Sequence, residues 1–226
     1  IDALHSRDAS LLEDAVNLMV EMNCNMVRCW GGNVYEDSRF FELCDENGIM
    51  VWQDFAMGCT FYPQRQDFAD AIEKEAISVV RKFRNHPSLV LWSGNNEDDI
   101  ALRWSLINFN INPNRDVVTR QVLPQVIYEM DPTRPFLPSS PYISQAIYEE
   151  GSHEDLMPEN HLWGPRGYYK DPFYTEAKAQ FVSEIGYHGC PNRESLEKMF
   201  TKDYVNPWLN GQVGLWNDEW MTKAVR

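Results

Sequence analysis

Residues 85–97, NHPSLVLWSGNNE, decide the fold of this chain of 226 residues. The apolar run within this stretch predicts a short strand covered on both faces, and the proline before it separates the strand from a preceding helix. The strand leads directly into a Gly-Asn-Asn-Glu tip, where the carboxyl of Glu97 stands beside two amide side chains. In barrels of alternating strands and helices, the chemistry lies at the carboxyl ends of the strands. Glu97 is therefore a candidate acid or base.

The rest of the chain repeats this alternation of helix and strand. Apolar residues at helical spacing predict helices over residues 8–22, 38–47, 68–84, 116–130 and 193–200, the fourth of them kinked at Pro124. Short apolar runs predict strands at residues 25–30, 49–55, 88–93, 136–140, 161–164 and 181–186. Strands that alternate with helices form a parallel sheet, so the predicted fold class is α/β. Because the sequence has no glycine-rich phosphate-binding loop, we favour a (β/α)8 TIM barrel over a nucleotide-binding sheet.

Composition limits the partners that this chain can have. Its 20 basic and 34 acidic residues give a formal charge of −14, which argues against a nucleic acid or an anionic membrane as partner. No apolar run approaches the ~18 residues that a membrane span needs, and no signal peptide is visible. The compartment stays open, a periplasmic or secreted parent enzyme included, and so does the oligomeric state.

The cysteines indicate neither a disulfide framework nor a metal site. There are five of them and no CxxC pair. We expect them to be mostly reduced, buried side chains, which is the usual state of free cysteine. The sequence therefore predicts no metal and no cofactor.

A second glutamate, Glu184, follows an apolar run near residue 181 and gives Glu97 a partner at the end of another predicted strand. Two carboxyls that face each other across a barrel mouth are what glycoside hydrolysis needs. One must protonate the leaving oxygen, while the other attacks the anomeric carbon or activates water. Arg28, at the end of a third predicted strand, is placed to supply hydrogen-bond donors. The alternative is that these residues are solvated surface charges.

Four stretches of the sequence resemble glycoside hydrolase family 2, and specifically its β-mannosidases. They are NHPSLVLWSGNNE at 85–97, RCWGGNVYE at 28–36, VWQDF at 51–55, and SEIGY at 183–187, which resembles the nucleophile strand of the family. The resemblance implies an eight-stranded barrel in which residues 25–30, 49–55, 88–93 and 181–185 are strands two, three, four and seven. The chain 1–226 would then be the central part of a catalytic domain. The first and last strands and the flanking β-sandwich domains of the parent enzyme would be absent from it.

The resemblance also assigns the chemistry. Glu97 resembles the acid/base and Glu184 the nucleophile of a retaining, double-displacement mechanism. The implied activity is that of an exo-β-glycoside hydrolase, a β-mannosidase first of all, with a β-mannoside as the carbohydrate substrate. Two alternatives stay open: a relative with β-galactosidase-like or β-glucuronidase-like specificity, and a carbohydrate-binding fragment without turnover.

Five further residues match positions that line the sugar pocket in this family. Asn96 resembles the amide that binds the sugar hydroxyl next to the anomeric carbon, and Arg28 resembles the arginine that orients the nucleophile. Trp30 resembles an aromatic residue that contacts the sugar. Asp54 and Trp163 stand at strand ends where the family also lines its pocket. For Trp30 and Trp163 a position in the core is an equally good interpretation.

Two acids and two histidines near these positions have a structural interpretation. Asp98 and Asp99 directly follow the strand tip, and we interpret them as cap and solvent-facing residues at the start of a helix. His161 begins a predicted strand, and His188 lies beyond the last predicted strand. Each histidine is a candidate to line the pocket, although a structural role is favoured for both.

Overall fold

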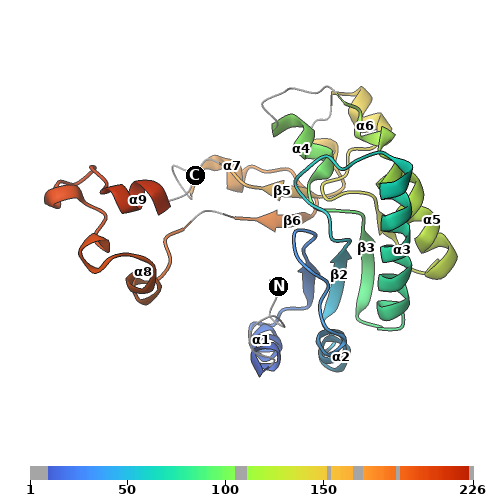
Figure 1. Ribbon diagram of the computed structural model, residues 1–226, viewed down its shortest axis with the longest axis horizontal. Helices are drawn as coiled ribbons and strands as arrows, with labels where there is room; N and C mark the ends of the chain where they lie inside the picture. Colours follow the sequence, from blue (N-terminus) through green and yellow to red (C-terminus); the bar gives the residue numbers. More distant parts are fainter. Residues whose placement is uncertain (1–9, 105–110, 152–153, 165–169, 187–188, 224–226) are drawn as a thin grey trace. The chain divides into compact units, whose positions relative to one another are not determined.

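A computed structural model describes residues 10–104, 111–151, 154–164, 170–186 and 189–223 of the chain (Figure 1). The helices are α1 Ser10–Glu21, α2 Ser38–Asn47, α3 Gln66–Phe83, α4 Asp98–Trp104, α5 Leu123–Met130, α6 Gln145–Glu149, α7 Pro172–Thr175, α8 Arg193–Met199 and α9 Asp218–Lys223. The strands are β1 Met26–Cys29, β2 Met50–Asp54, β3 Leu89–Ser93, β4 Phe136–Leu137, β5 Asn160–Leu162 and β6 Val182–Ile185. The chain divides into two compact units, Ile1–His161 with Ala179–Ser183, and Leu162–Lys178 with Glu184–Arg226. None of the helices within the described ranges is both long and apolar enough to cross a membrane.

The first unit is built on a parallel sheet whose strands lie in sequence order, β1-β2-β3-β4. A helical connection separates each strand from the next, which is the repeat of a barrel wall. Consecutive helices contact one another along the outside of the sheet, α1 with α2, α2 with α3, and α3 with α5. Figure 1 shows α3 and α5 running along the strands. This arrangement brings the carboxyl ends of all four strands to one edge of the sheet.

Aromatic side chains fill the core between this sheet and its helices. Phe41 stacks on Phe83 with ring centroids 4.2 Å apart, and Phe55 stacks on Trp92 at 5.4 Å. The indole of Trp92 is fully buried and donates its N–H to Asp131 at 2.9 Å. A buried indole with its N–H satisfied combines large apolar burial with no unpaired donor. The core therefore fixes β3, the strand that carries the Asn-Asn-Glu tip.

The predicted elements are confirmed, with shorter or shifted boundaries. Helix α2 has the predicted bounds and ends at Gly48, whose φ of 68° and N–H bond to Cys44 close the last turn. The helix predicted at 116–130 begins instead as a π-helical turn over Val118–Val122, in which Leu123 donates its N–H to the Val118 carbonyl. This wider turn directly precedes Pro124, which has no N–H to donate.

The last strand of the parallel sheet is shorter than the sequence predicts. The sequence predicts a strand over the five residues 136–140, whereas β4 is the pair Phe136–Leu137. Pro138 follows and lacks the N–H that would continue the ladder. The chain nevertheless stays beside β3, because Gly94 donates its N–H to the Leu137 carbonyl at 2.8 Å.

Gly94 is required where β3 and β4 approach each other. A Cβ atom added at this position would lie 2.1 Å from the carbonyl oxygen of Pro138, which is backbone. We expect Gly94→Ala to lower the free energy of unfolding by about 3 kcal/mol, because the two strands must separate to admit the methyl group. Gly48→Ala is the matched control. Its Cβ would meet no atom within 4 Å, and only the left-handed backbone costs roughly 1 kcal/mol. Denaturant unfolding of both variants tests this, and equal losses would contradict it.

The second unit is held by a small aromatic cluster. Phe200 stacks on Trp220 with ring centroids 4.8 Å apart, and the Lys223 ammonium lies 4.8 Å from the centroid of the Phe200 ring. The buried side chain of Asn217 donates to the carbonyl oxygens of Tyr204 and Asn206. These contacts join α8, α9 and the segment between them. Strands β5 and β6, each of which has residues in both units, pair with each other in a two-stranded sheet.

Candidate active site

The strand tip that carries Glu97 continues the sheet beyond its strands. Asn96 makes single parallel bridges to Gly58 on one side and to Ser140 on the other, and Glu97 donates its N–H to the Ser140 carbonyl at 2.7 Å. Glu97 itself has a φ of 65°, which side-chain-bearing residues rarely adopt. Such backbone persists only where its surroundings hold it, as at functional sites. The bridges on both sides therefore fix the position from which the Glu97 side chain leaves the backbone.

Arg28, at the end of β1, is locked by Asp54 at the end of β2. Its Nη2 and Nε atoms lie 2.7 and 3.3 Å from the two carboxylate oxygens, and the guanidinium lies over the ring of Trp52. Asp54 also accepts from the Trp52 indole at 2.8 Å and from Gly31 N at 3.0 Å. Complete burial raises the pKa of Asp54, and Arg28 with these N–H donors opposes that rise. The structure thus places Asp54 behind Arg28, as the group that aims it.

Arg28 in turn fixes the amide of Asn96. Its Nη2 atom lies 2.8 Å from Oδ1 of Asn96. Because a guanidinium only donates, the amide atom that faces it must be the oxygen. The Nδ2 group of Asn96 then points toward the Sγ atom of Cys59, at 3.3 Å. Asn96 is 1% exposed, so this amide has a single, well-defined orientation.

His161 contacts Glu97 directly, which the sequence did not favour. Its Nδ1 atom lies 2.7 Å from Oε1 of Glu97, while its Nε2 atom lies 3.2 Å from Nη1 of Arg28 and 3.0 Å from Oγ of Ser140. Since arginine can only donate, Nε2 accepts, and Nδ1 therefore carries the proton that it donates to Glu97. The imidazole is buried, so the contact is shielded from water. The other candidate, His188, lies outside the described residues.

Cys59 approaches the second oxygen of the same carboxyl. Its Sγ atom lies 3.4 Å from Oε2 of Glu97. Burial and the negative charge of Glu97 raise the pKa of the Cys59 thiol to about 11, so it stays protonated and donates. All five cysteines are free, as expected, but Cys59 and Cys190 are exposed, so the expectation of burial fails for these two. Glu97 is thus held by an imidazole at one oxygen and a thiol at the other.

Asp99 corrects the interpretation of the two acids after Glu97 as cap and solvent residues. It is 4% exposed and pairs with Arg120, whose Nη2 atom lies 2.5 Å from Oδ2. It also accepts the backbone N–H of Ile143 at 3.0 Å. Burial raises the pKa of Asp99, and the guanidinium of Arg120 opposes this. The neighbouring Asp98 is half-buried and lines a cavity together with residues of the segment before α5.

The two tryptophans of the predicted pocket are both exposed, so a core position is wrong for either. Trp30, in the first unit, is 41% exposed and lies across Gly32, where a Cβ atom would come within 2.2 Å of its ring. Trp163, in the second unit, is 44% exposed and lies across Gly186. Glycine below each ring lets the indole lie flat on the backbone. Exposed, flat indoles are suited to stacking on a sugar.

Within the second unit, Trp163 also orients Glu184. Its indole N–H donates to Oε2 of Glu184 at 2.9 Å. Tyr174 donates its hydroxyl to the Gly186 carbonyl at 3.0 Å, and Gly186 donates its N–H to Leu162. These contacts hold the segment that follows Glu184 beside Trp163. Glu184, the second carboxyl of the prediction, is therefore oriented by Trp163, which the sequence also predicts in the sugar pocket.

The first unit has parallel strands with helices on the outside of the sheet. An acid, an amide and an arginine lie at the carboxyl ends of these strands. This is the arrangement found in the catalytic domains of TIM-barrel enzymes. Residues 5–213 match the family described as "Glycosyl hydrolases family 2, TIM barrel domain". The chain belongs to this family, and the predicted α/β barrel fold is confirmed, with the parallel sheet forming part of the barrel.

Several proteins similar to this chain are beta-mannosidases. A "Beta-mannosidase" of Bos taurus is 36% identical over 208 residues, which are 86% of this chain and 23% of the relative. A "Beta-mannosidase B" of Aspergillus terreus is 33% identical over 194 residues, 80% of this chain and 23% of the relative. The crystal structure of a beta-D-mannosidase from Dictyoglomus thermophilum aligns with a TM-score of 0.69 at 34% identity, covering 84% of this chain and 24% of that one. The chain thus spans about a quarter of the length of these relatives.

Proposed function

We propose that this chain is the central part of the catalytic domain of a larger retaining exo-β-mannosidase. Membership of the family and the similarity to beta-mannosidases over most of the chain support the activity. Coverage of about a quarter of each relative supports the larger enzyme, in which β-sandwich domains flank the barrel. The observation that carries the mechanism is the buried contact of 2.7 Å between His161 and Glu97. It orients one carboxyl at the end of a barrel strand for proton transfer.

Glu97 is the acid/base and Glu184 the nucleophile in this proposal. A carboxylate oxygen of Glu184 forms a bond to the anomeric carbon while the bond to the leaving oxygen breaks, and the Glu97 proton passes to that oxygen. Glu97 then takes a proton from water, which displaces Glu184 and restores the configuration. Both oxygens of Glu97 have a donor, but the imidazole N–H of His161 lies 2.7 Å from Oε1, whereas the weakly donating thiol of Cys59 lies 3.4 Å from Oε2. The proton that Glu97 transfers is therefore carried by Oε2, the oxygen with the weaker donor.

The remaining predicted residues position the sugar in this proposal. Asn96, aimed by Arg28, is placed to bind the hydroxyl next to the anomeric carbon, where hydrogen bonds strengthen in the transition state. Trp30 offers an exposed ring for stacking, and Trp163 offers another beside Glu184. Asp54 acts through Arg28, because it is buried beneath it. The predicted contact of Arg28 with the nucleophile stays a prediction.

The proposal is tested with the full-length protein that contains this chain. Aryl β-mannoside, β-galactoside and β-glucuronide are compared by kcat/KM, and the first product released from the mannoside is followed by proton NMR. We expect β-mannoside to be preferred and the product to appear first as the β anomer. Preference for another glycoside would refute the specificity, and a first product of α configuration would refute retention.

His161→Ala should lower kcat of the full-length enzyme on mannobiose by about 10²-fold, because Glu97 loses the donor that orients it. The loss should be much smaller for a dinitrophenyl β-mannoside, whose leaving group needs little protonation. His161→Asn should recover part of the activity, since an amide can also donate. His86→Ala is the matched control, because His86 pairs with Asp45 at 2.7 Å and away from Glu97. A loss of equal size on both substrates would show that His161 has only a structural role.

A further inference from the structure

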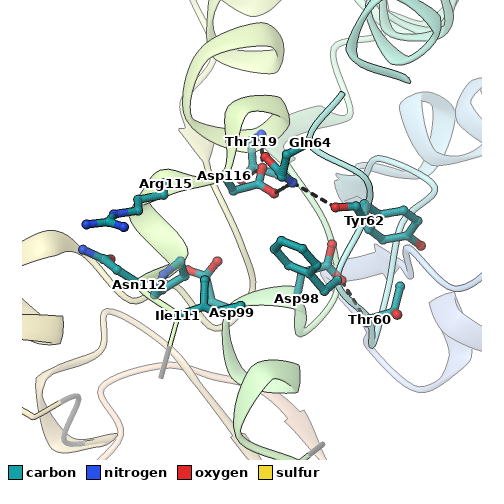
Figure 2. A pocket seen from close by; sticks show the side chains of 12 residues that line it. Thr60, Tyr62, Gln64, Asp98, Asp99, Ile111, Asn112, Arg115, Asp116 and Thr119 are labelled. Carbon is teal, nitrogen blue, oxygen red and sulfur yellow. Dashed lines mark hydrogen bonds between the residues drawn. The ribbon is translucent and has the colours of Figure 1, made fainter. Parts of the chain in front are cut away.

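A cavity of about 70 Å³ lies in the first unit, at the carboxyl edge of the parallel sheet (Figure 2). Three segments form its wall: the loop after β2 around residues 60–64, the first turn of α4, and residues 111–119 before α5. All three follow strands β2 and β3 on the side where the barrel carries its chemistry. None of the residues assigned to catalysis or to the sugar pocket above lines it. The cavity is therefore a separate recess beside the candidate site.

The cavity wall includes the residues that directly follow Glu97 and its neighbour Cys59 in the sequence. Thr60 and Asp98 lie on its wall, and they directly follow Cys59 and Glu97, whose Sγ and Oε2 atoms are 3.4 Å apart. The stronger donor, His161, lies at Oε1, so in the proposed mechanism the glycosidic oxygen receives its proton from Oε2, on the side of Cys59. The group that departs with that oxygen is then directed toward Thr60 and Asp98.

The polar groups of the wall favour a sugar over a cation. Three acids line the cavity, but Asp99 is paired with Arg120, and Asp116 accepts from Gln64 at 2.7 Å and from Thr119 at 2.8 Å. Two of the three carboxylates are thus already engaged by protein donors. A divalent cation needs several carboxylate or carbonyl oxygens that are free to turn toward it.

Of the three acids that line the cavity, Asp98 has the fewest hydrogen bonds to protein donors among the described residues. Among the described residues it accepts one long hydrogen bond, from Thr60 N at 3.4 Å (Figure 2). Burial, with the negative charges of Asp116 and Asp99, raises the pKa of Asp98 to about 8. At neutral pH the carboxyl is therefore largely protonated, and it can both donate to and accept from a hydroxyl group.

Phe61 supplies the apolar part of the same wall. Phe61 is 49% exposed and lines the cavity, together with Tyr62. Binding sites commonly combine aromatic walls with a few polar groups that fix orientation. The C–H face of a pyranose matches the ring of Phe61, and its hydroxyls match the carboxyl of Asp98 and the hydroxyl of Thr60.

We propose that this cavity is the inner part of the leaving-group subsite. Its volume of about 70 Å³ is too small for a whole pyranose, so it receives the hydroxyl groups along one edge of the second pyranose of an oligosaccharide substrate, beside Asp98, while the ring itself packs against the exposed side chain of Phe61. The proposal rests on the proposed function, since it needs Glu97 as the acid. It assigns Phe61 and Asp98 to binding of the leaving sugar and to neither step of bond cleavage.

The test compares two substrates of the full-length enzyme that share one glycone. Mannobiose carries a sugar leaving group, whereas β-mannosyl fluoride has no group that could enter the cavity. We expect Phe61→Ala and Asp98→Ala each to lower kcat/KM for mannobiose about tenfold, which corresponds to about 1.4 kcal/mol. Both variants should stay within about twofold of the wild type on β-mannosyl fluoride. Asp98→Asn should recover activity on mannobiose. Tyr128→Ala removes another exposed aromatic ring, on α5, and should change neither value.

Each other outcome is decisive. Equal losses on both substrates, or no loss on mannobiose, would overturn the leaving-group subsite while leaving the proposed function intact. The same holds if the wild type cleaves β-mannosyl fluoride but not mannobiose. If the wild type cleaves no β-mannoside of any kind, the proposed function fails first and the subsite fails with it.

Discussion

Glu184→Ala should lower kcat/KM for aryl β-mannosides by roughly 10⁵-fold in the full-length enzyme, the scale on which covalent catalysis depends on its nucleophile. Without the carboxylate no glycosyl-enzyme can form, and water must attack unaided. The variant should still bind the sugar, because the positioning residues are unchanged. Steady-state kinetics measure the loss, and circular dichroism checks that the fold is retained.

Two controls separate the role of Glu184 from that of its surroundings. Glu176→Ala removes an exposed glutamate of the same unit and should leave activity within about twofold. Trp163→Phe keeps the nucleophile but removes the N–H that donates to Oε2 at 2.9 Å, so we expect a loss of about tenfold. A fluorosugar inactivator should label the peptide that contains Glu184. Label on another residue, or normal activity of Glu184→Ala, would refute the assignment.

The sequence predicted that polar side chains at several strand ends come together, because parallel strands place their ends at one edge of the sheet. Arg28, Asp54 and Asn96 each follow or end an apolar run, and their side chains bond to one another as that geometry implies. The strand boundaries were less predictable, because they depend on which backbone groups find a partner. At Pro138, for example, the missing N–H ends β4 although the surrounding residues would suit a longer strand.

The parts of the site that the sequence missed depend on contacts between distant residues. His161 lies 64 positions from Glu97 and 133 from Arg28, and no local pattern indicates that its two nitrogens face these partners. The one signal in the sequence that pointed to His161 was its position at one end of a predicted strand, because other predicted strands of the chain also carry polar residues at their ends. Asp99 is similar: acids in the first turn of a helix are usually solvated, and its burial is explained by two distant partners, the guanidinium of Arg120 and the backbone N–H of Ile143.

Glu97→Ala should show a loss that depends on the leaving group. For mannobiose we expect kcat/KM to fall by about 10⁴-fold, the upper range of general acid catalysis, because a sugar alkoxide leaves poorly without a proton. For a dinitrophenyl β-mannoside the first step should be nearly unchanged, and the glycosyl-enzyme should accumulate because water now lacks a base. Glu73→Ala, an exposed acid on α3, is the matched control. Equal losses on both substrates would remove Glu97 from the role of acid/base.

Azide distinguishes the two carboxyls by the configuration of its product. In Glu97→Ala, azide needs no base, so it can displace Glu184 from the glycosyl-enzyme and release β-mannosyl azide. In Glu184→Ala, azide attacks the substrate from the opposite face while Glu97 protonates the leaving oxygen, so the product is α-mannosyl azide. Each assignment therefore predicts one anomer, and exchanging the two roles would exchange the anomers. If Glu97→Ala gave α-mannosyl azide and Glu184→Ala gave β-mannosyl azide, the double-displacement mechanism would stand. Glu97 would then be the nucleophile and Glu184 the acid/base.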